Sequence, residues 1–396
     1  MLVYMAEKGS DGESQVATVT PSELDEQITA GKEIVILDTR SENEFDTWHI
    51  QGDTVEIINY PYFRLLDGIP EELLTELPTS RTITVVCAKG GASEMVAGKL
   101  EDEGHTVNHL EQGMNGWAEI YESAELPVAS SAIITQYQRP SSGCLAYLVV
   151  SGDEAAVIDP LRAFSDVYMR DAEAADAEII HAVDTHIHAD HISGTRTVAD
   201  ETGATVTLPQ AAADRGFEHA GPYQTLTDGD SLAVGDVTID AVAMPGHTSG
   251  MTAYAVSDVL FTGDGLFVES VARPDLEDRD AAREAAKILH DSLTTLVSTR
   301  SGETVIAPGH FSGAADPTDD GTYIATLEEL QDTMSALSMA TDRFVEYVLA
   351  DMPPQPTNYQ EIIATNLGHQ SPTDQEAFEL ELGPNNCAAG ADTQGA

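Results

Sequence analysis

The stretch "AVDTHIHADHISG", residues 182–194, places His186, His188, Asp190 and His191 within six positions. A buried polar side chain needs a hydrogen-bonding partner, and a solvated loop gains nothing from so many imidazoles. Convergence on a cation explains the pattern, because imidazoles and carboxylates bind metal ions and the ion compensates the negative charge. The stretch therefore predicts a metal site.

Three later segments supply further candidate ligands. "MPGHTSG" contains His247, "LFTGDGLF" contains Asp264 and "VIAPGH" contains His310. Each follows an apolar, strand-like run and a turn-forming glycine, and loops at strand ends are where functional residues are usually placed. A lone His or Asp is most often structural, but seven candidates in strand-end settings indicate a metal centre. The other histidines have no such setting, and we expect them to be structural.

Residues 131–369 read as one domain. Apolar, β-rich runs such as "CLAYLVV", "EAAVIDP" and "GDVTIDAVAMPG" are separated by helical patterns at about 164–175, 193–202 and 279–297. This alternation predicts two sheets with helices outside, an αββα sandwich. The connector "SAELPVASSA", residues 123–132, marks the boundary with a preceding domain.

A smaller α/β domain with a parallel sheet is predicted for residues 15–125. Its strand "TITVVC" (82–87) runs into the loop "CAKGGA" and a helix that Gly104 closes. Loop N–H groups and the helix N-terminus converge on the Cys87 sulfur, and Lys89 adds positive charge. Both effects favour an anionic sulfur or a bound persulfide. We therefore expect Cys87 to be reactive rather than a small core residue.

The composition restricts the partners and the location. Asp and Glu outnumber Lys and Arg 68 to 18, for a formal charge of -50. Nucleic acids and anionic membranes need basic residues, so neither is an expected partner. We interpret the evenly spread acidity as adaptation to a salt-rich cytoplasm, because about 1 M salt shortens the Debye length to about 3 Å. Three cysteines and the lack of a recognisable signal peptide or membrane span favour a soluble cytoplasmic protein.

Three motifs of the first domain resemble the signatures of the rhodanese family of sulfurtransferases. They are "LDTRSENEFDTWHIQGD" (37–53), "VVCAKGGAS" (85–93) and "GMNGWAE" (113–119). The resemblance implies a three-layer α/β fold that Asp38 and Arg40 help to hold together, with Ala92 where many active members carry an arginine. It assigns persulfide formation to Cys87 and the sulfur-cradling loop to Lys89, Gly90 and Gly91.

The seven candidate ligands resemble those of the metallo-β-lactamase superfamily. "SSGCLAYLV", "VIDP" and "FTGDGLFVESVARPDL" are similar to its persulfide dioxygenase branch, in which two histidines and one aspartate hold one Fe(II). The resemblance gives that role to His186, His247 and Asp264. Arg273 lies in a segment similar to one of that branch, which suggests a substrate contact. The residues left for a second site or for support of the first are His188, Asp190, His191 and His310.

The leading hypothesis is a sulfur-metabolism enzyme with one Fe(II) per chain. It would oxidise a low-molecular-weight thiol persulfide to sulfite, and its rhodanese domain would transfer sulfur, with thiols, sulfite and thiosulfate as small-molecule partners. A glyoxalase II-like thioesterase (hydroxyacylglutathione hydrolase), with two Zn²⁺ and an accessory rhodanese domain, is the alternative. A sulfane-sulfur carrier or sensor with a structural metal is a third hypothesis, which the complete ligand set disfavours.

The amino-acid sequence leaves two features undecided. The sequence leaves assembly into a homo-oligomer undecided. The tail, residues 370–396, is small and polar, so we expect its end to be loosely ordered, and Cys387 within it shows no evident chemistry.

Overall fold

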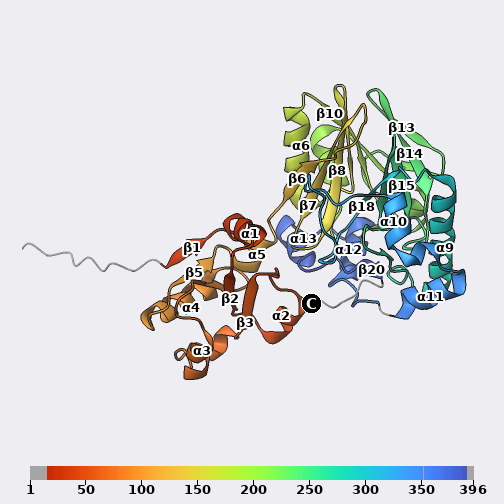
Figure 1. Cartoon of the computed structure of the whole chain (residues 1–396). Coiled ribbons are helices and arrows are strands. Elements are labelled where there is room, and N and C mark those ends of the chain that lie inside the picture. Colours follow the sequence, from red (N-terminus) through yellow and green to blue (C-terminus); the bar gives the residue numbers. More distant parts are fainter. Residues whose placement is uncertain (1–15, 351, 390–396) are drawn as a thin grey trace, which may run out of the picture. The chain divides into compact units, whose positions relative to one another are not determined.

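The computed structural model describes residues 16–350 and 352–389, and the chain divides into two compact units after Ile120 (Figure 1). Each unit builds its own sheets and core. No helix in these described ranges is long and apolar enough to cross a lipid bilayer.

The first unit is a parallel five-stranded sheet in the order β1-β5-β4-β2-β3. Its strands are β1 (Ala17–Val19), β2 (Ile34–Asp38), β3 (Val55–Asn59), β4 (Ile83–Val86) and β5 (Val107–Leu110). Its helices are α1 (Pro21–Thr29), α2 (Glu42–Thr47), α3 (Glu71–Glu76), α4 (Gly91–Asp102) and α5 (Gly113–Trp117).

Both faces of this sheet are covered, as the sequence predicts for a three-layer domain. Along β2, Val35 and Leu37 pack into a cluster with α3 and α4, whereas Ile34 and Ile36 pack into another with α1 and α5. This is the alternation that a strand buried on both sides requires.

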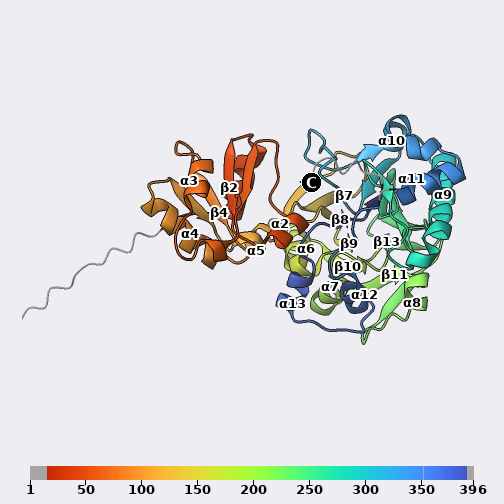
Figure 2. The same ribbon diagram turned by 90° about the horizontal axis from the view of Figure 1, so that it is seen from below.

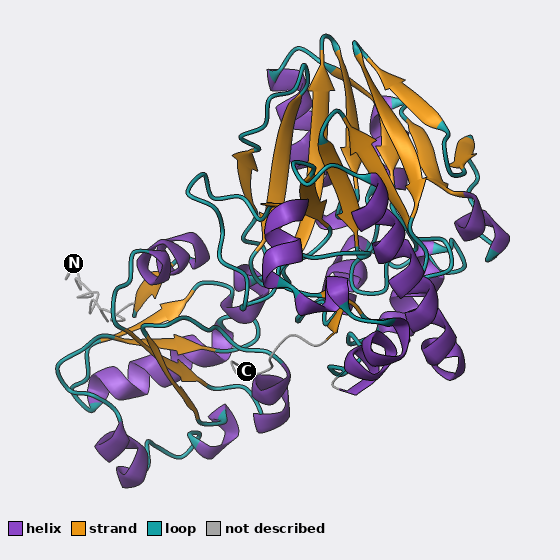
Figure 3. Cartoon of the chain, turned by 45° about the vertical axis from the view of Figure 1, so that its right-hand side comes forward, coloured by secondary structure: helices purple, strands orange, loops and turns teal. Residues whose placement is uncertain are grey.

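The second unit is a sandwich of two sheets, which confirms the predicted αββα architecture (Figure 3). The seven-stranded sheet has the order β12-β11-β10-β9-β8-β7-β6, and the six-stranded sheet has the order β13-β14-β15-β16-β18-β19. The strands of the first sheet are β6 (Glu122–Glu125), β7 (Ile133–Arg139), β8 (Cys144–Ser151), β9 (Glu154–Ile158), β10 (Glu178–Val183), β11 (Thr205–Pro209) and β12 (Tyr223–Leu226). Those of the second are β13 (Ser231–Val234), β14 (Val237–Ala243), β15 (Thr252–Val256), β16 (Val259–Gly263), β18 (Val305–Pro308) and β19 (Ala325–Thr326).

Helices cover the outer faces of the sandwich (Figure 2). The six-stranded sheet packs against α9 (Ala282–Thr299), α10 (Leu327–Thr333) and α11 (Thr341–Ala350). The seven-stranded sheet packs against α6 (Ser165–Ala174) and α7 (Thr195–Thr202). The inner core joins residues of both sheets, such as Tyr147 and Val183 from one and Tyr254 and Phe261 from the other. The remaining helices are α8 (Gln210–Asp214), α12 (Tyr359–Asn366) and α13 (Asp374–Leu380).

Two segments differ from the prediction. The connector 123–132 begins inside β6, which pairs with β7 as the edge strand of the second unit.

The tail is built into the fold as far as residue 389, because β20 (Ala388–Ala389) pairs with β17 (Val271–Ala272). Glu381 also forms a 2.9 Å ion pair with Arg139, and both side chains are at most 1% exposed. A buried guanidinium needs such a partner. The expected loose end, residues 390–396, lies outside the described residues.

Candidate metal centre and sulfur-binding loop

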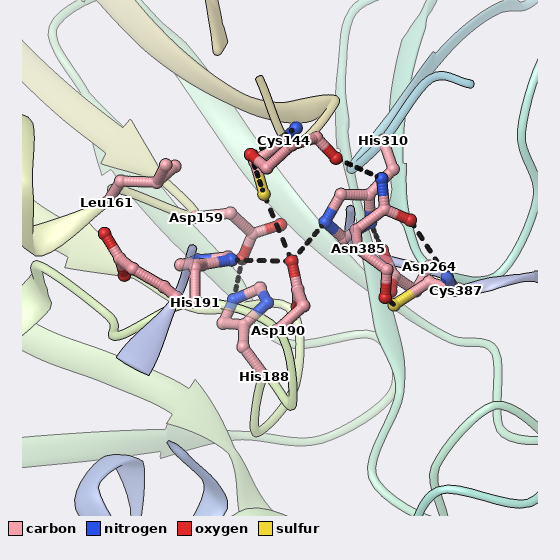
Figure 4. A network of polar contacts seen from close by, with 12 residues as sticks. Cys144, Asp159, Leu161, His188, Asp190, His191, Asp264, His310, Asn385 and Cys387 are labelled. Carbon is pink, nitrogen blue, oxygen red and sulfur yellow. Dashed lines mark hydrogen bonds and ion pairs between the residues drawn. The ribbon is translucent and has the colours of Figure 1, made fainter. Parts of the chain in front are cut away.

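The predicted ligands follow the ends of four strands and lie in one buried region. Figure 4 shows five of them, His188, Asp190, His191, Asp264 and His310. The loop after β10, residues 184–193, is called the metal loop here. His247 follows β14, Asp264 directly follows β16, and His310 follows β18. All seven predicted residues are at most 6% exposed, so the surrounding fold rather than solvent determines their chemistry.

Three of the seven face one another through atoms that have no other partner. His247 Nε2 lies 3.5 Å and His186 Nε2 lies 3.9 Å from Asp264 Oδ2. None of these three buried atoms has a hydrogen-bond partner. Unpartnered buried polar atoms are costly, and one cation with ligand bonds of about 2 Å would satisfy all three. These residues therefore fit a single metal ion, in agreement with their predicted grouping.

The far sides of these ligands are fixed by hydrogen bonds. His247 Nδ1 donates to the Arg273 carbonyl at 2.8 Å, and His186 Nδ1 lies 3.0 Å from Thr185 Oγ1. Such contacts set the tautomer and direct the lone pair of Nε2 to the metal position. Burial holds the pKa of His186 well below its usual value and also lowers the pKa of His247. Both rings are therefore neutral, the form that ligates metals.

His310 lies between two carboxylates. Its Nδ1 is 2.5 Å from Asp264 Oδ1, and its Nε2 is 2.7 Å from Asp190 Oδ2. Burial alone would lower the pKa of His310, but Asp264 and Asp190 outweigh it and hold that pKa well above the usual value. The positive charge of protonated His310 in turn outweighs the effect of burial on Asp264 and holds the pKa of Asp264 below its usual range. Asp264 therefore stays ionised, with Oδ2 left for a metal.

His188 is held apart from the three-ligand cluster. Its Nε2 lies 3.1 Å from Asp159 Oδ1 and 3.6 Å from Asp184 Oδ1. Burial and the nearby His191 would lower the pKa of His188, but the two carboxylates raise it to about 9. His188 is thus a charged partner of an acidic pair. Asp159, which the sequence argument quoted only within "VIDP", also accepts the backbone N–H and hydroxyl of Thr185 at 2.7 and 2.8 Å.

The metal loop is held from the far end of the chain. Asn366 Nδ2 donates to the carbonyls of His188 and His191 at 3.0 and 2.8 Å. Glu381 Oε2 accepts the backbone N–H of Ile192 at 2.8 Å. Sequence reasoning missed both residues, because nothing local to them indicates a contact with a loop so far away in the chain.

Two cysteines border the cluster on either side of His310, as Figure 4 shows. Cys144 Sγ lies 3.1 Å from Asp190 Oδ2. Cys387 Sγ lies within 4.8 Å of ligand atoms of Asp190, Asp264 and His310, and burial raises the pKa of its thiol well above the usual value. The sequence indicates no chemistry for Cys387, and the structure places it, directly before β20, beside this cluster.

Arg273 serves a different purpose from the predicted substrate contact. Its guanidinium is 1% exposed and binds Asp275 through Nε (2.7 Å) and Nη2 (3.1 Å). Nη1 donates to the carbonyls of Pro354 and Asn386 at 2.8 and 3.0 Å. With these donors engaged, Arg273 joins the C-terminal segment to the carbonyl that orients His247.

In the first unit, Cys87 lies at the end of β4 and before α4, as predicted. Its sulfur accepts the Gly90 N–H at 3.1 Å and lies 3.3 Å from Ser93 Oγ. Gly90 has φ of 93°, a left-handed conformation that favours glycine. The Lys89 side chain is exposed. The loop therefore directs a backbone donor at the sulfur, and Ser93 is a contact that the sequence argument missed.

Asp38 and Arg40 hold this domain together through a buried ion pair. Arg40 Nη2 lies 2.6 Å from Asp38 Oδ2 and also donates to the Trp48 carbonyl at 2.6 Å. The pair thus connects the end of β2 to the segment after α2.

Comparisons with known proteins agree with both resemblances. Residues 20–120 match the rhodanese-like domain, and residues 140–332 match the metallo-beta-lactamase superfamily. Human mitochondrial persulfide dioxygenase ETHE1 is 28% identical over 254 residues, 61% of this chain and 91% of the relative. The hydroxyacylglutathione hydrolase of Erythrobacter litoralis is 29% identical over 190 residues, 46% of this chain and 69% of the relative. The crystal structure of ETHE1 from Myxococcus xanthus aligns with a TM-score of 0.52 and 26% identity, covering 60% of this chain and all (100%) of that one.

Proposed function

This chain joins a rhodanese-like domain to a metallo-beta-lactamase domain, and on that premise we propose that it oxidises a low-molecular-weight thiol persulfide to sulfite with a single iron ion. Persulfide, dioxygen and water are converted to thiol, sulfite and two protons. The sulfane sulfur loses four electrons, and dioxygen accepts them. The sulfur-metabolism role itself accords with the dioxygenase relatives and the rhodanese domain.

The observation that carries the proposal is the set of three unpartnered atoms, His186 Nε2, His247 Nε2 and Asp264 Oδ2. Two imidazoles and one carboxylate are the ligands of mononuclear iron oxygenases, and they leave positions open for substrate and dioxygen. An Fe(II) bound there would supply the redox chemistry that dioxygen needs beside a sulfur donor.

The residues around these ligands prepare the site. The Arg273 carbonyl orients His247 through Nδ1, and His310 fixes Asp264 through Oδ1. Because these groups are buried, water is largely excluded and a reactive sulfur species is protected from side reactions. His310 keeps its protons at Nδ1 and Nε2, directed at Asp264 and Asp190, and so balances the charge of both carboxylates.

The rhodanese-like domain would carry out sulfur transfer at Cys87. The Cys87 thiolate attacks the sulfane sulfur of thiosulfate, the S–S bond breaks, and sulfite leaves with the bonding electron pair. The Gly90 N–H, 3.1 Å from the sulfur, stabilises the anionic sulfur before and after this step. An acceptor thiolate then attacks the outer sulfur and restores Cys87.

The experiment is metal analysis combined with oxygen uptake. The full chain is loaded with Fe(II) under anaerobic conditions, and the iron per chain is measured. Oxygen consumption and sulfite are then followed with several low-molecular-weight persulfides. About one iron per chain and stoichiometric sulfite support the proposal. Folded, iron-loaded protein that consumes no oxygen with any persulfide would overturn it.

A glyoxalase II-like thioesterase is the second candidate, favoured by the hydroxyacylglutathione hydrolase relatives. That activity would place two Zn²⁺ among all seven ligands. In this structure His188 is bound to Asp159 and Asp184 instead. Two zinc ions per chain together with thioester hydrolysis, and no oxygen uptake, would favour this candidate.

A further inference from the structure

We propose that Glu269 selects persulfides whose carrier thiol bears an ammonium group, that is, persulfides of aminothiols. The inference rests on the proposed function, because it names the class of substrate that would reach the three-ligand site. Glu269 follows the ligand Asp264 closely in the sequence. Neither the metal centre nor the ion pairs described above account for a carboxylate at this position.

Glu269 is held in a tight turn that the chain makes soon after Asp264. Phe267 N donates to the Ser270 carbonyl at 3.0 Å across this turn. The strand that follows, β17, is anchored by its pairing with β20. The ring of Phe267 lies 6.1 Å from the ring of His310, measured between centroids. The turn that carries Glu269 therefore packs directly against the metal centre.

The protein itself does not satisfy the Glu269 carboxylate. Its Oε2 atom is buried and has no hydrogen-bond partner. Burial raises the pKa of Glu269, and this effect outweighs the hydrogen bonds from Ser312 and the positive charge of His310, which lower it. No lysine or arginine in the described ranges forms an ion pair with Glu269. A buried carboxylate needs a cation or several donors, and the chain supplies too few of them.

Glu269 lies between the buried centre and the surface. Glu269 and Ser312 are partly exposed, whereas Asp264 and His310, which precede them in the same two segments, are at most 3% exposed. Both segments thus run outward from the metal centre to solvent. A small molecule that enters along them toward the centre would pass the Glu269 carboxylate.

An ammonium group suits this position better than the other common groups of a small thiol. It carries a positive charge and three donors, and a carboxylate is its natural acceptor. Ser270 Oγ, on the same turn, is also buried without a partner and offers a second acceptor. A thiol that bears a carboxylate would instead meet the negative charge of Glu269 on a chain whose formal charge is -50, and such repulsion excludes wrong ligands.

The test compares cysteamine with N-acetylcysteamine, in which acetylation removes the positive charge. Binding of each thiol to full-length, Fe(II)-loaded protein is measured anaerobically by calorimetry, and the two persulfides are used for oxygen uptake. We expect cysteamine to bind about 10–100-fold more tightly, the range of a charge-assisted hydrogen bond. Glu269→Gln should bring the ratio of the two affinities close to one. Glu269→Lys should reverse the preference in favour of 3-mercaptopropionate, which carries a carboxylate.

Glu201→Gln is the matched control, because it removes the same charge from an exposed position on α7 and should keep the ratio. Circular dichroism establishes that each variant is folded. Equal affinities for the two thiols in the unchanged protein, or no binding of either, would overturn the inference. A ratio that Glu269→Gln leaves unchanged would overturn it too, because solvent would then satisfy the carboxylate. Selective binding of cysteamine without oxygen uptake from any persulfide would overturn the proposed function alone.

Discussion

His310 and Asp264 are joined by a 2.5 Å hydrogen bond between Nδ1 and Oδ1, which leaves only Oδ2 of Asp264 facing the two unpartnered histidine nitrogens. This bond divides the seven predicted ligands. Three of them present free atoms to a single position, whereas His310 and Asp190 are engaged with each other. The three-ligand site therefore depends on His310 to keep Asp264 Oδ2 directed at His186 and His247.

The first prediction concerns the ion itself. His247→Ala should lower iron content from about one per chain to near zero, because only two ligands remain and a facial triad needs three. The exposed His369 provides the control, and His369→Ala should retain iron. Elemental analysis of both proteins, loaded under identical conditions, checks this. Undiminished iron in folded His247→Ala would remove His247 from the ligand set.

The second prediction concerns His310 as the residue that positions Asp264. His310→Ala should weaken iron binding by about 10–100-fold, the range typical of groups that orient a ligand. His310→Gln, which can still donate a hydrogen bond to Asp264, should recover part of the loss. Competition with a chelator measures the affinities. Equal affinities in Ala, Gln and unchanged protein would show that Asp264 needs no support.

The third prediction separates the two activities. Cys87→Ser should lose sulfur transfer from thiosulfate but keep oxygen-dependent sulfite production, because the proposed iron ligands lie in the other unit. Asp264→Ala should do the reverse. Both activities are measured in both proteins, and mass spectrometry looks for the mass of one added sulfur on Cys87. Loss of sulfite production in Cys87→Ser would mean that sulfur must pass through the rhodanese-like domain first.

The fourth prediction concerns the buried pair Arg139–Glu381, whose side chains are at most 1% exposed. Glu381→Gln should lower the free energy of unfolding by about 3–5 kcal/mol, because it removes a buried negative charge that faces the buried Arg139 guanidinium. Asp374→Asn breaks the exposed pair with Arg162 and should cost at most about 1 kcal/mol. Urea denaturation compares them. Equal, small effects would mean that the C-terminal segment adds little to stability.

The fifth prediction concerns salt. The melting temperature should rise strongly from dilute buffer to molar KCl, because ions screen the repulsion of a net charge of -50. Sucrose, which stabilises folded proteins without screening, is the control and should give a much smaller rise. A melting temperature that does not change with KCl would contradict the interpretation of the acidity as salt adaptation.

The parts of the site that could be predicted are those with local signals. His186, His247 and Asp264 each follow a strand within a few residues, so the periodic apolar pattern and the adjacent motif identify them together. The same holds for Cys87 between β4 and α4. Local signals also placed the two sheets, since strands buried on both faces are continuous apolar runs.

The missed features depend on contacts between distant segments. Cys144 and His310 become neighbours through a bridge between strands that are far apart in the sequence. Arg273 looks like a free cation in the sequence, but Asp275 and two carbonyls of the C-terminal segment engage it. The described part of the tail is small and polar, yet Glu381 pairs with Arg139 and β20 pairs with β17, both far away in the sequence. No local pattern carries such information.

The hydrogen bond from Ile192 to Glu381 has a consequence for biosynthesis. The metal loop emerges from the ribosome long before residue 381 does, so during translation it lacks the carboxylate and the Asn366 amide that later hold it. We therefore expect the loop to reach its final conformation, and any metal to be bound, only after nearly the whole chain has been made. A nascent chain stalled before residue 366 should present the histidines of the metal loop without the contacts that hold it.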